Sequence, residues 1–388
     1  HQGFESEYYF ENGLRKVYPY HFGFQTFCKG RWVGRNIIDV MQKEFRQLPL
    51  EQFNKRCAKG LITVNGERIS VGYVLKDNDK ILNVVHRHEL PVLACPIHIV
   101  HECKDLLIID KPPSIPVHPC GRYRLNSVML ILKREYGYNN LYSKLDRLTS
   151  GLLIMAKTKE KAKEVIQQIE DRVVEKEYVC KVEGEFPEGE VICDEPIDRL
   201  THKIGIFYVD KNGKESVTRF EKISSNGKTS IVRCKPKTGR THQIRVHLQF
   251  LGYPIINDGI YNSFAFGPNK GKNGDFGGKS KEQLIADLLN EHPIEQWYDN
   301  DSLVPPIDLD QNNVIASSPL NSFEFGIYSE TEEMKKYMES TKFDCTKFQV
   351  VEDCEECLVK FRDPKPEKLF MYLHCLRYKV IDRNIYKN

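Results

Sequence analysis

An apolar run that begins directly after a glycine most constrains the fold of this chain. Leu152–Ala156 follows Gly151, and a run of this length is typical of a buried β-strand. The residues before it carry both signs of charge, because Asp146 has Lys144 two positions earlier and Arg147 directly after it. A carboxylate beside cations stays ionised, which suits a nucleophile better than a proton donor. A charged turn that merely precedes a strand is the alternative interpretation.

A second segment, Lys237–Leu248, combines a turn, a helical pattern and basic residues. Thr241 is a suitable helix N-cap. Ile244 and Leu248 lie four positions apart, on the face expected to point to the core. Arg245 flanks that face near the predicted helix start, where its guanidinium suits bidentate pairing with a carboxylate. The alternative is that Arg245 is a solvated surface charge, as most arginines are.

Together, the two segments resemble the RluA-type pseudouridine synthases. That family carries Arg-Leu-Asp-x-x-Thr-Ser-Gly around its catalytic aspartate, which corresponds to residues 144–151 here. It also carries Thr-Gly-Arg-Thr-His-Gln-Ile-Arg-Val-His on a later strand and helix, which is unchanged in residues 238–247. The departure is Lys144, where the family usually has an arginine that helps to displace the target base. Lysine keeps the charge but lacks the planar stacking fork, so we expect an altered displacement step or a contribution from Arg147.

Two shorter elements of the same family occur in the expected order. Its Lys-x-Tyr element matches residues 176–178. Its Asp-Lys-Pro element with a downstream Pro-Val-His-Pro matches residues 110–112 and 116–119. Four ordered matches between about residues 93 and 262 argue against a chance resemblance.

The resemblance implies roles for individual residues. Asp146 would attack C1′ of the target uridine or remove a proton from C2′, and Arg245 would pair with it and keep it ionised. Tyr178 would stack on the extruded base and is a candidate acceptor of the C5 proton, with core packing as the alternative. The substrate-binding residues expected from the motifs are Lys144, Arg147, Thr149, His118, Arg240, Thr241, His242 and Gln243.

The resemblance also implies an α+β fold, with a mixed, mainly antiparallel central sheet and flanking helices (the pseudouridine synthase fold). Upstream, two helical patterns precede a hairpin signal at Asn65-Gly66, which resembles the small S4-like α/β RNA-binding domain. The predicted divisions are an aromatic-rich extension packed on the body (1–30), the S4-like domain (31–90), the catalytic domain (93–262), a partly mobile insertion (263–367) and a segment that returns to the catalytic domain (368–388).

Basic residues gather in or beside the S4-like segment. The net charge of the whole chain is only +3, so any nucleic-acid surface must come from such local clustering. A basic cluster can follow a phosphate backbone by releasing counterions, whereas a solvated helix face is the alternative. The predicted RNA contacts are Lys29, Arg31, Arg35, Arg56, Lys59 and Arg68.

Cysteine and histidine positions predict no metal site. The 12 cysteines among 388 residues lack the density of a disulfide scaffold and favour a reducing compartment. His86 and His88 are two positions apart on a predicted strand, and Cys354-x-x-Cys357 has half of the spacing of a zinc site. Because neither pair has an obvious partner in the sequence, we expect a linker and free thiols, and leave open whether the cysteines bind zinc.

The predicted activity is isomerisation of specific uridines in RNA, at uridine 32 of the tRNA anticodon loop and/or in messenger RNA. The reaction is redox-neutral, so we expect no cofactor, and neither a phosphate loop nor a dinucleotide fingerprint occurs in the sequence. A catalytically weak or inactive RNA-binding or RNA-folding protein on the same scaffold is the main alternative. A carboxylate hydrolase for small substrates is a second alternative, which leaves the S4-like segment unexplained.

The expected partner is RNA, and the chain is expected to act as a monomer away from membranes. Its apolar runs are far shorter than the ~18 residues that a membrane span needs. The sequence starts at His1 without a methionine, so a targeting peptide could be missing from it. We expect a cytoplasmic or nuclear protein, with a mitochondrial form left open.

Overall fold

An eight-stranded sheet is the largest element of the computed structural model, which describes residues 6–44, 50–143, 148–201, 205–291, 332–352, 354–358 and 363–380. Its strand order is β12-β15-β16-β11-β17-β10-β9-β8. The strands are β8 (His98–Glu102), β9 (Leu106–Lys111), β10 (Ser150–Ala156), β11 (Val174–Glu183), β12 (Glu190–Cys193), β15 (Thr218–Ser225), β16 (Thr229–Pro236) and β17 (Leu373–Val380). Neighbouring strands are antiparallel except β10 and β17, which confirms the predicted mixed, mainly antiparallel sheet.

The last described strand, β17, lies inside this sheet rather than at its edge. It pairs with β11 on one side and with β10 on the other, and the short parallel contact with β10 places Gly151 opposite Cys375. Gly151 has a φ of 101°, and a Cβ built there would lie 2.6 Å from the backbone nitrogen of Cys375. Only glycine fits this contact. Gly151 of the first motif therefore allows β17 to pair with β10 inside the sheet.

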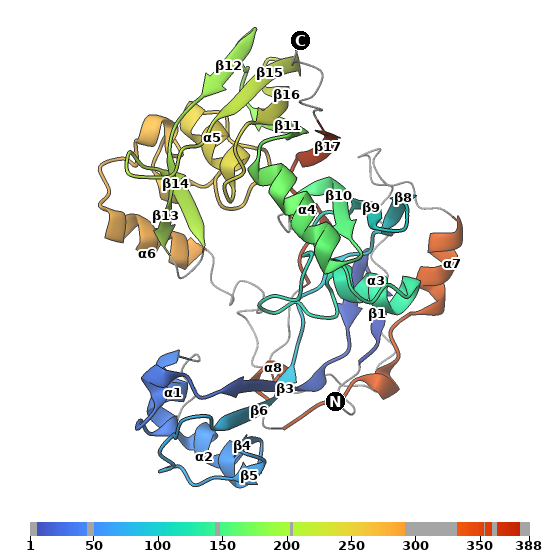
Figure 1. Cartoon of the computed structure of the whole chain (residues 1–388), viewed down its shortest axis with the longest axis vertical. Coiled ribbons are helices and arrows are strands. Elements are labelled where there is room, and N and C mark those ends of the chain that lie inside the picture. Colours follow the sequence, from blue (N-terminus) through green and yellow to red (C-terminus); the bar gives the residue numbers. More distant parts are fainter. Residues whose placement is uncertain are drawn as a thin grey trace.

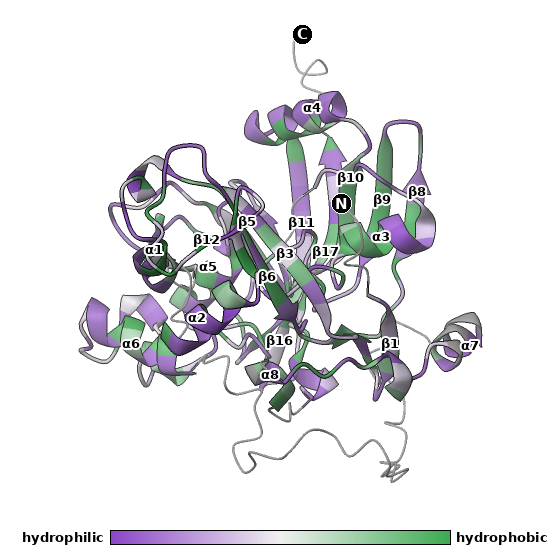
Figure 2. Ribbon diagram, turned by 90° about the horizontal axis from the view of Figure 1, so that it is seen from below, coloured by the Kyte–Doolittle hydropathy of each residue, from purple (hydrophilic) through white to green (hydrophobic). Residues whose placement is uncertain are grey.

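Two hydrophobic clusters cover this sheet on opposite faces. Leu153 of β10 packs in a cluster with β9 and with Ile131 of helix α3 (Val128–Tyr136). Leu152 points to the other face, as its neighbouring position requires, and packs against a cluster that contains Ile244 of helix α5 (Gln243–Leu251). Figure 2 shows mostly hydrophobic colours on β9 and β10 and mostly hydrophilic colours on the outer helix α4 (Lys159–Glu170).

Local sequence signals account for several of these elements. The hydroxyl of Thr158 accepts a hydrogen bond of 3.1 Å from the backbone nitrogen of Lys161 and so caps α4. The remaining elements around the sheet are β13 (Ile197–Thr201), β14 (Ile206–Val209), α6 (Lys281–Glu291), α7 (Glu332–Ser340), α8 (Glu355–Leu358), and the 3₁₀ turns η2 (Phe264–Phe266), η3 (Lys272–Gly274), η5 (Cys345–Lys347) and η6 (Pro366–Lys368).

A smaller unit with its own core lies at the opposite end of the molecule from β12 and β15 (Figure 1). Its sheet has the order β3-β6-β4-β5, and the buried Trp32 and Phe53 belong to a core that joins this sheet to its helices. Asn65 and Gly66 have φ values of 54° and 85°, which confirms the predicted hairpin turn. Its elements are β3 (Tyr20–Phe27), η1 (Gly30–Trp32), α1 (Ile37–Glu44), α2 (Leu50–Ala58), β4 (Ile62–Val64), β5 (Glu67–Arg68) and β6 (Lys80–Arg87). Membership of the S4 class stays a prediction.

Several aromatic N-terminal residues pack in the interior, whereas Phe24 and Phe27 are exposed. The strands β1 (Tyr8–Glu11), β2 (Leu14–Val17) and β7 (Val92–Leu93) form a three-stranded sheet. Tyr9 and Tyr18 are buried, and their ring centroids are 4.6 Å apart.

Among the described residues, no helix is long and apolar enough to cross a membrane. Much of the predicted insertion, residues 292–331, lies outside the described residues.

The contact between Gly151 and Cys375 generates a stability prediction. Gly151→Ala should lower the free energy of unfolding by about 3 kcal/mol or more, because the new methyl group overlaps the backbone of β17 at a strained φ. Urea unfolding at constant pH measures the loss. The matched control is Gly137→Ala, at a φ of 78° with no heavy atom within 4 Å of the added Cβ, which should cost about 1 kcal/mol. Equal losses of unfolding free energy in the two variants would show that overlap with the β17 backbone adds nothing to the cost of Gly151→Ala.

Candidate active site

Residues 144–147, which include Asp146 and the predicted substrate residues Lys144 and Arg147, lie outside the described residues. The chain on their N-terminal side is anchored to β10. The backbones of Tyr142 and Ala156 exchange two hydrogen bonds of 3.0 Å. The hydroxyl of Ser143 donates to the carbonyl of Ile154.

The predicted substrate residue His118 lies beside the same anchor. Its Nε2 contacts the carbonyl oxygen of Ser143. On the other side of the gap, Thr149 is only 2% exposed, and the hydroxyl of Ser150 lies 3.1 Å from Nδ1 of His374 in β17. The structure therefore brings His118 and Thr149 to the two ends of the segment that carries Asp146.

Tyr178 of β11 faces the same central strands. It pairs with Cys375 of β17 and with Cys234 of β16. Burial raises the pKa of Tyr178 well above its ordinary value of 10, and the neighbouring Tyr378 and Cys375 raise it further. Its phenol is therefore protonated at neutral pH and can donate a hydrogen bond or stack, but a neutral phenol is a poor proton acceptor.

Lys176, two residues before Tyr178, connects β11 to the second motif. A Cβ built on Gly239 would lie 3.1 Å from the Nζ atom of Lys176, so the amino group rests against the Thr-Gly-Arg turn. Burial lowers the pKa of Lys176, and Cys375 partly offsets this effect. Lys176 belongs to the Lys-x-Tyr motif, for which only Tyr178 had a predicted role.

The start of helix α5 differs from the prediction. Thr241 is not its N-cap: the capping position is His242, which has a left-handed φ of 58° and makes no side-chain cap bond. The side chain of Gln243 holds the turn instead. Its Oε1 accepts hydrogen bonds from the backbone of Arg240 (3.0 Å) and from the hydroxyl of Thr238 (2.7 Å). These bonds fix the turn, so a threonine cap is not needed.

Three predicted substrate residues at this turn differ in exposure and partners. Nδ1 of His242 lies 2.8 Å from the hydroxyl of Tyr261. Arg240 is half-buried and donates from Nε to the carbonyl of Glu215 over 3.1 Å. Thr241 is exposed. Of the three predicted substrate contacts named here, His242 is thus engaged by the fold, and Arg240 and Thr241 lie nearer to solvent.

Arg245 forms a buried bidentate pair with a carboxylate that sequence reasoning missed. Its Nε and one terminal nitrogen donate to Asp258 over 2.8 Å each, and the two side chains are 2% and 0% exposed. Asp258 also accepts from the backbone nitrogens of Ile260 and Tyr261, at 3.0 and 3.1 Å. The surface-charge alternative for Arg245 is wrong, whereas its predicted partner Asp146 lies outside the described residues. A turn aspartate 13 residues after Arg245 was the available signal for Asp258.

His247 completes the polar interior of α5. Its Nδ1 lies 2.9 Å from the hydroxyl of Thr218, and its Nε2 lies 3.0 Å from the carbonyl of Glu195. Burial lowers the pKa of His247 to about 4, so the ring is neutral in the folded protein at pH 7. Gln243, Arg245 and His247 therefore hold the motif helix in place through buried polar contacts.

The predicted RNA contacts of the smaller unit differ in their exposure to solvent. Arg56 points inward, where it donates to the side chain of Asn83 and the carbonyl of Val84 over 2.7 Å each. Arg35 is half-buried. The exposed members of the set are Lys29, Arg31, Lys59 and Arg68.

The Arg245–Asp258 pair predicts a large effect on stability. Asp258→Ala should lower the free energy of unfolding by about 3–5 kcal/mol, because it leaves a guanidinium buried without its carboxylate. Glu215→Ala is the matched control, since its ion pair with Arg172 is 62% and 54% exposed and should contribute under about 1 kcal/mol. Chemical unfolding of both variants tests this difference, and a loss below 1 kcal/mol for Asp258→Ala would contradict it.

The neutral His247 predicts a loss of stability in acid. The unfolded chain binds a proton at this residue below about pH 6.5, whereas the folded chain resists it until about pH 4. The free energy of unfolding should therefore fall by up to about 3 kcal/mol from this group as the pH drops from 7 to 4. His247→Gln removes the titration, so its stability difference from the wild type should shrink as the pH falls. Parallel pH profiles of the two proteins would refute the assignment.

Comparison with known proteins agrees with the geometry. The family model for RNA pseudouridylate synthase matches residues 105–250. The mouse pseudouridylate synthase RPUSD2 is 46% identical over 97% of this chain and 71% of its own length. The mitochondrial tRNA pseudouridine(32) synthase of Saccharomyces cerevisiae is 43% identical over 76% of this chain and 65% of its own. The tRNA pseudouridine(31) synthase of the same yeast is 30% identical over 97% and 94%, respectively.

These matches confirm the predicted resemblance and favour the enzyme over an inactive RNA-binding protein or a small-substrate hydrolase. They also agree with the mixed sheet and flanking helices of the fold. The chain therefore belongs to the RNA pseudouridylate synthase family, and it isomerises uridine to pseudouridine in RNA.

Proposed function

We propose that the target is uridine 32 in the anticodon loop of tRNA, with messenger RNA as a second class of target. The observation that carries the proposal is the 43% identity to the yeast protein named tRNA pseudouridine(32) synthase. The yeast protein named for position 31 is more distant, at 30% identity. A loop is also a favourable target because extruding a base costs least where it is not paired in a helix.

Asp146 is the proposed nucleophile at C1′ or base at C2′ of the target uridine. Ser143 and Thr149 each lie three residues from it, so covalent geometry keeps its Cα within about 11 Å of either one. The chain on both sides of this segment is fixed to the central strands, through Ile154 on one side and His374 on the other. This anchoring supports a site at the strands β10, β17 and β11.

Tyr178 is proposed to stack on the extruded base and to donate a hydrogen bond. Its raised pKa argues against the role of C5 proton acceptor that the motif suggested. Lys176 is proposed to hold Asp146 ionised, in place of Arg245. Arg245 is already neutralised by Asp258, whereas burial and Cys375, rather than a carboxylate, shift the pKa of Lys176 among the residues that the structure describes.

The remaining basic residues are proposed to bind phosphates. Lys144 and Arg147 flank Asp146, and Arg240 lies on the Thr-Gly-Arg turn next to Lys176. On the smaller unit, the exposed set Lys29, Arg31, Lys59 and Arg68 supports an S4-like RNA-binding role, in which affinity should fall with salt. Arg56 is the least suitable of the predicted RNA contacts, because its guanidinium already donates hydrogen bonds to Asn83 and Val84.

We further propose a monomer that acts in the cytoplasm, the nucleus or the mitochondrion.

Release of tritium from tRNA labelled at uridine C5 tests this function, because C5 loses its hydrogen when it bonds to C1′. The wild type should release label from position 32 of the anticodon loop, and Asp146→Ala should release it at least about 10³-fold more slowly. RNA affinity should change little in this variant, since only the chemical step is removed. Asp198→Ala, at an exposed aspartate in β13, is the matched control and should keep full activity.

Mapping of the modified position separates the parts of the proposal. Pseudouridine at position 31 alone, or only in ribosomal RNA, would overturn the proposed target while leaving the activity intact. Full activity of Asp146→Ala would instead overturn the assignment of the catalytic aspartate.

A further inference from the structure

Four potential metal ligands converge at the junction between the smaller unit and the rest of the chain. They are His86, His88, Cys354 and Cys357, and their ligand atoms all lie within 4.8 Å of one another. His86 lies in β6 and His88 directly follows that strand, whereas Cys354 directly precedes α8 and Cys357 lies within it, more than 260 positions later. In the sequence each pair is half of a site, and the fold brings the two halves together.

The distances between these atoms fit a tetrahedral ion. His86 Nδ1 and His88 Nε2 are 3.3 Å apart. The sulfur of Cys357 lies 3.3 Å from the first nitrogen and 3.4 Å from the second, and the sulfur of Cys354 lies 3.5 Å from the second. A zinc ion with Zn–S bonds of about 2.3 Å and Zn–N bonds of about 2.0–2.1 Å requires edges of about 3.3–3.8 Å between tetrahedral ligands.

The local backbone presents both pairs in the required direction. His86 and His88 are two positions apart, so they project to the same side of the extended chain. Cys354 and Cys357 lie on a tight turn, in which the Cys357 nitrogen donates to the Cys354 carbonyl over 3.0 Å. The Val351 nitrogen donates to the Cys357 sulfur over 3.4 Å, as outer partners of thiolate ligands do. Both cysteines are free thiols rather than a disulfide.

We propose that His86, His88, Cys354 and Cys357 bind one Zn²⁺ ion as a structural site. Two histidines and two cysteines fill all four tetrahedral positions, so no open position remains for substrate or water. The same ligand set can hold a [2Fe–2S] cluster, but there the histidines and cysteines bind different iron atoms. Nitrogen–sulfur separations of 3.3–3.5 Å are too short for that arrangement and fit a single ion.

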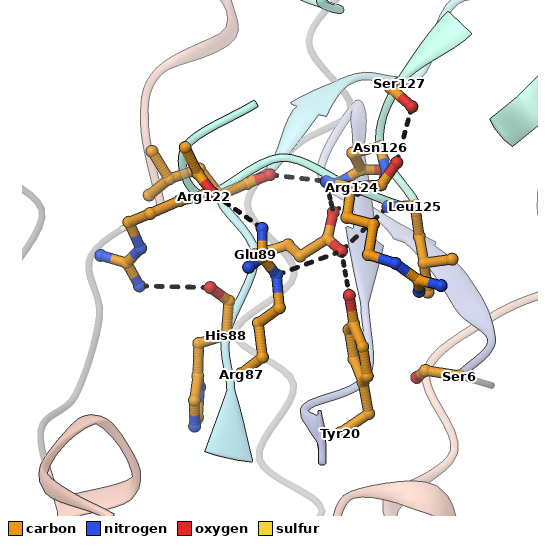
Figure 3. Close-up of polar contacts among 12 residues, drawn as sticks. Ser6, Tyr20, Arg87, His88, Glu89, Arg122, Arg124, Leu125, Asn126 and Ser127 are labelled. Carbon is orange, nitrogen blue, oxygen red and sulfur yellow. Dashed lines mark hydrogen bonds and ion pairs between the residues drawn. The ribbon is translucent and has the colours of Figure 1, made fainter. Parts of the chain in front are cut away.

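The site connects three parts of the chain that are distant in sequence. Arg122, on the segment before α3, donates to the carbonyl of His88 over 3.5 Å and pairs with Glu356 of α8 over 2.5 Å. Figure 3 shows Arg122 reaching the carbonyl of His88, and the carboxylate of the next residue, Glu89, facing Tyr20 and the backbone of Arg124. Glu89 accepts hydrogen bonds from the hydroxyl of Tyr20 (2.6 Å) and from the backbone of Arg124 (2.9 Å). Zinc at this point would therefore fix the C-terminal segment to β6 and to the body at once.

Metal analysis of the full chain purified from zinc-supplemented cells tests the proposal. Elemental analysis should find one zinc per chain and no matching iron, and His88→Ala and Cys357→Ser should each lose at least about 80% of it. Cys345→Ser and Cys103→Ser, at exposed cysteines outside the site, are the matched controls and should keep the zinc. A wild type without zinc, or variants that keep it, would overturn the site.

X-ray absorption at the zinc edge of the wild type covers the case in which a variant fails to fold. It should give two sulfur ligands at about 2.3 Å and two nitrogen ligands at about 2.0–2.1 Å. A shell of only nitrogen and oxygen ligands would refute the assignment. Chelation should also lower the melting temperature of the wild type and leave a folded His88→Ala unchanged. None of these measurements depends on the RNA target, so they are independent of the proposed function.

Discussion

The contact between Gly151 and the backbone of Cys375 is the constraint on which the rest of this structure depends. It allows β17 to lie between β10 and β11, and these three strands carry the anchors of the candidate active site. Ser150 is held against His374 through this pairing, and Tyr178 is placed opposite Cys375. A side chain at Gly151 would separate β10 from β17. The two halves of the sheet would then lose their connection, and Ser150 would lose its contact with His374.

Most side chains of the second motif stabilise the fold and do not face solvent. Gln243, Arg245 and His247 lie in the interior, and each polar group is matched by a partner from another element. A buried guanidinium is costly unless it is paired and hydrogen-bonded, and Asp258 supplies both conditions. The motif therefore fixes helix α5 against β15 and against the segment after the helix. This leaves the Thr-Gly-Arg turn, with Lys176 beside it, as the part of the motif that the proposed active site uses.

Sequence patterns were sufficient where the signal was local. The hairpin at Asn65-Gly66 followed from turn chemistry, because both residues take the left-handed backbone conformation that this pair favours. They were insufficient where the partner is distant. The central position of β17, the pairing of Arg245 with Asp258 and the meeting of His86 with Cys357 each require the tertiary fold. The helix start at His242 was missed for a different reason, since a long-range polar side chain, Gln243, replaced the usual cap.

The C-terminal part of the chain therefore performs two tasks that must be completed together. It supplies β17 to the central sheet, and it supplies Cys354 and Cys357 to the proposed zinc site beside β6. Both contacts join residues that are more than 200 positions apart, so neither can form until nearly the whole chain is available. The zinc site would hold this segment near its binding partners and reduce the entropy lost when β17 enters the sheet. With zinc bound as proposed, insertion of β17 into the sheet and formation of the junction with the smaller unit would be coupled through the C-terminal part of the chain.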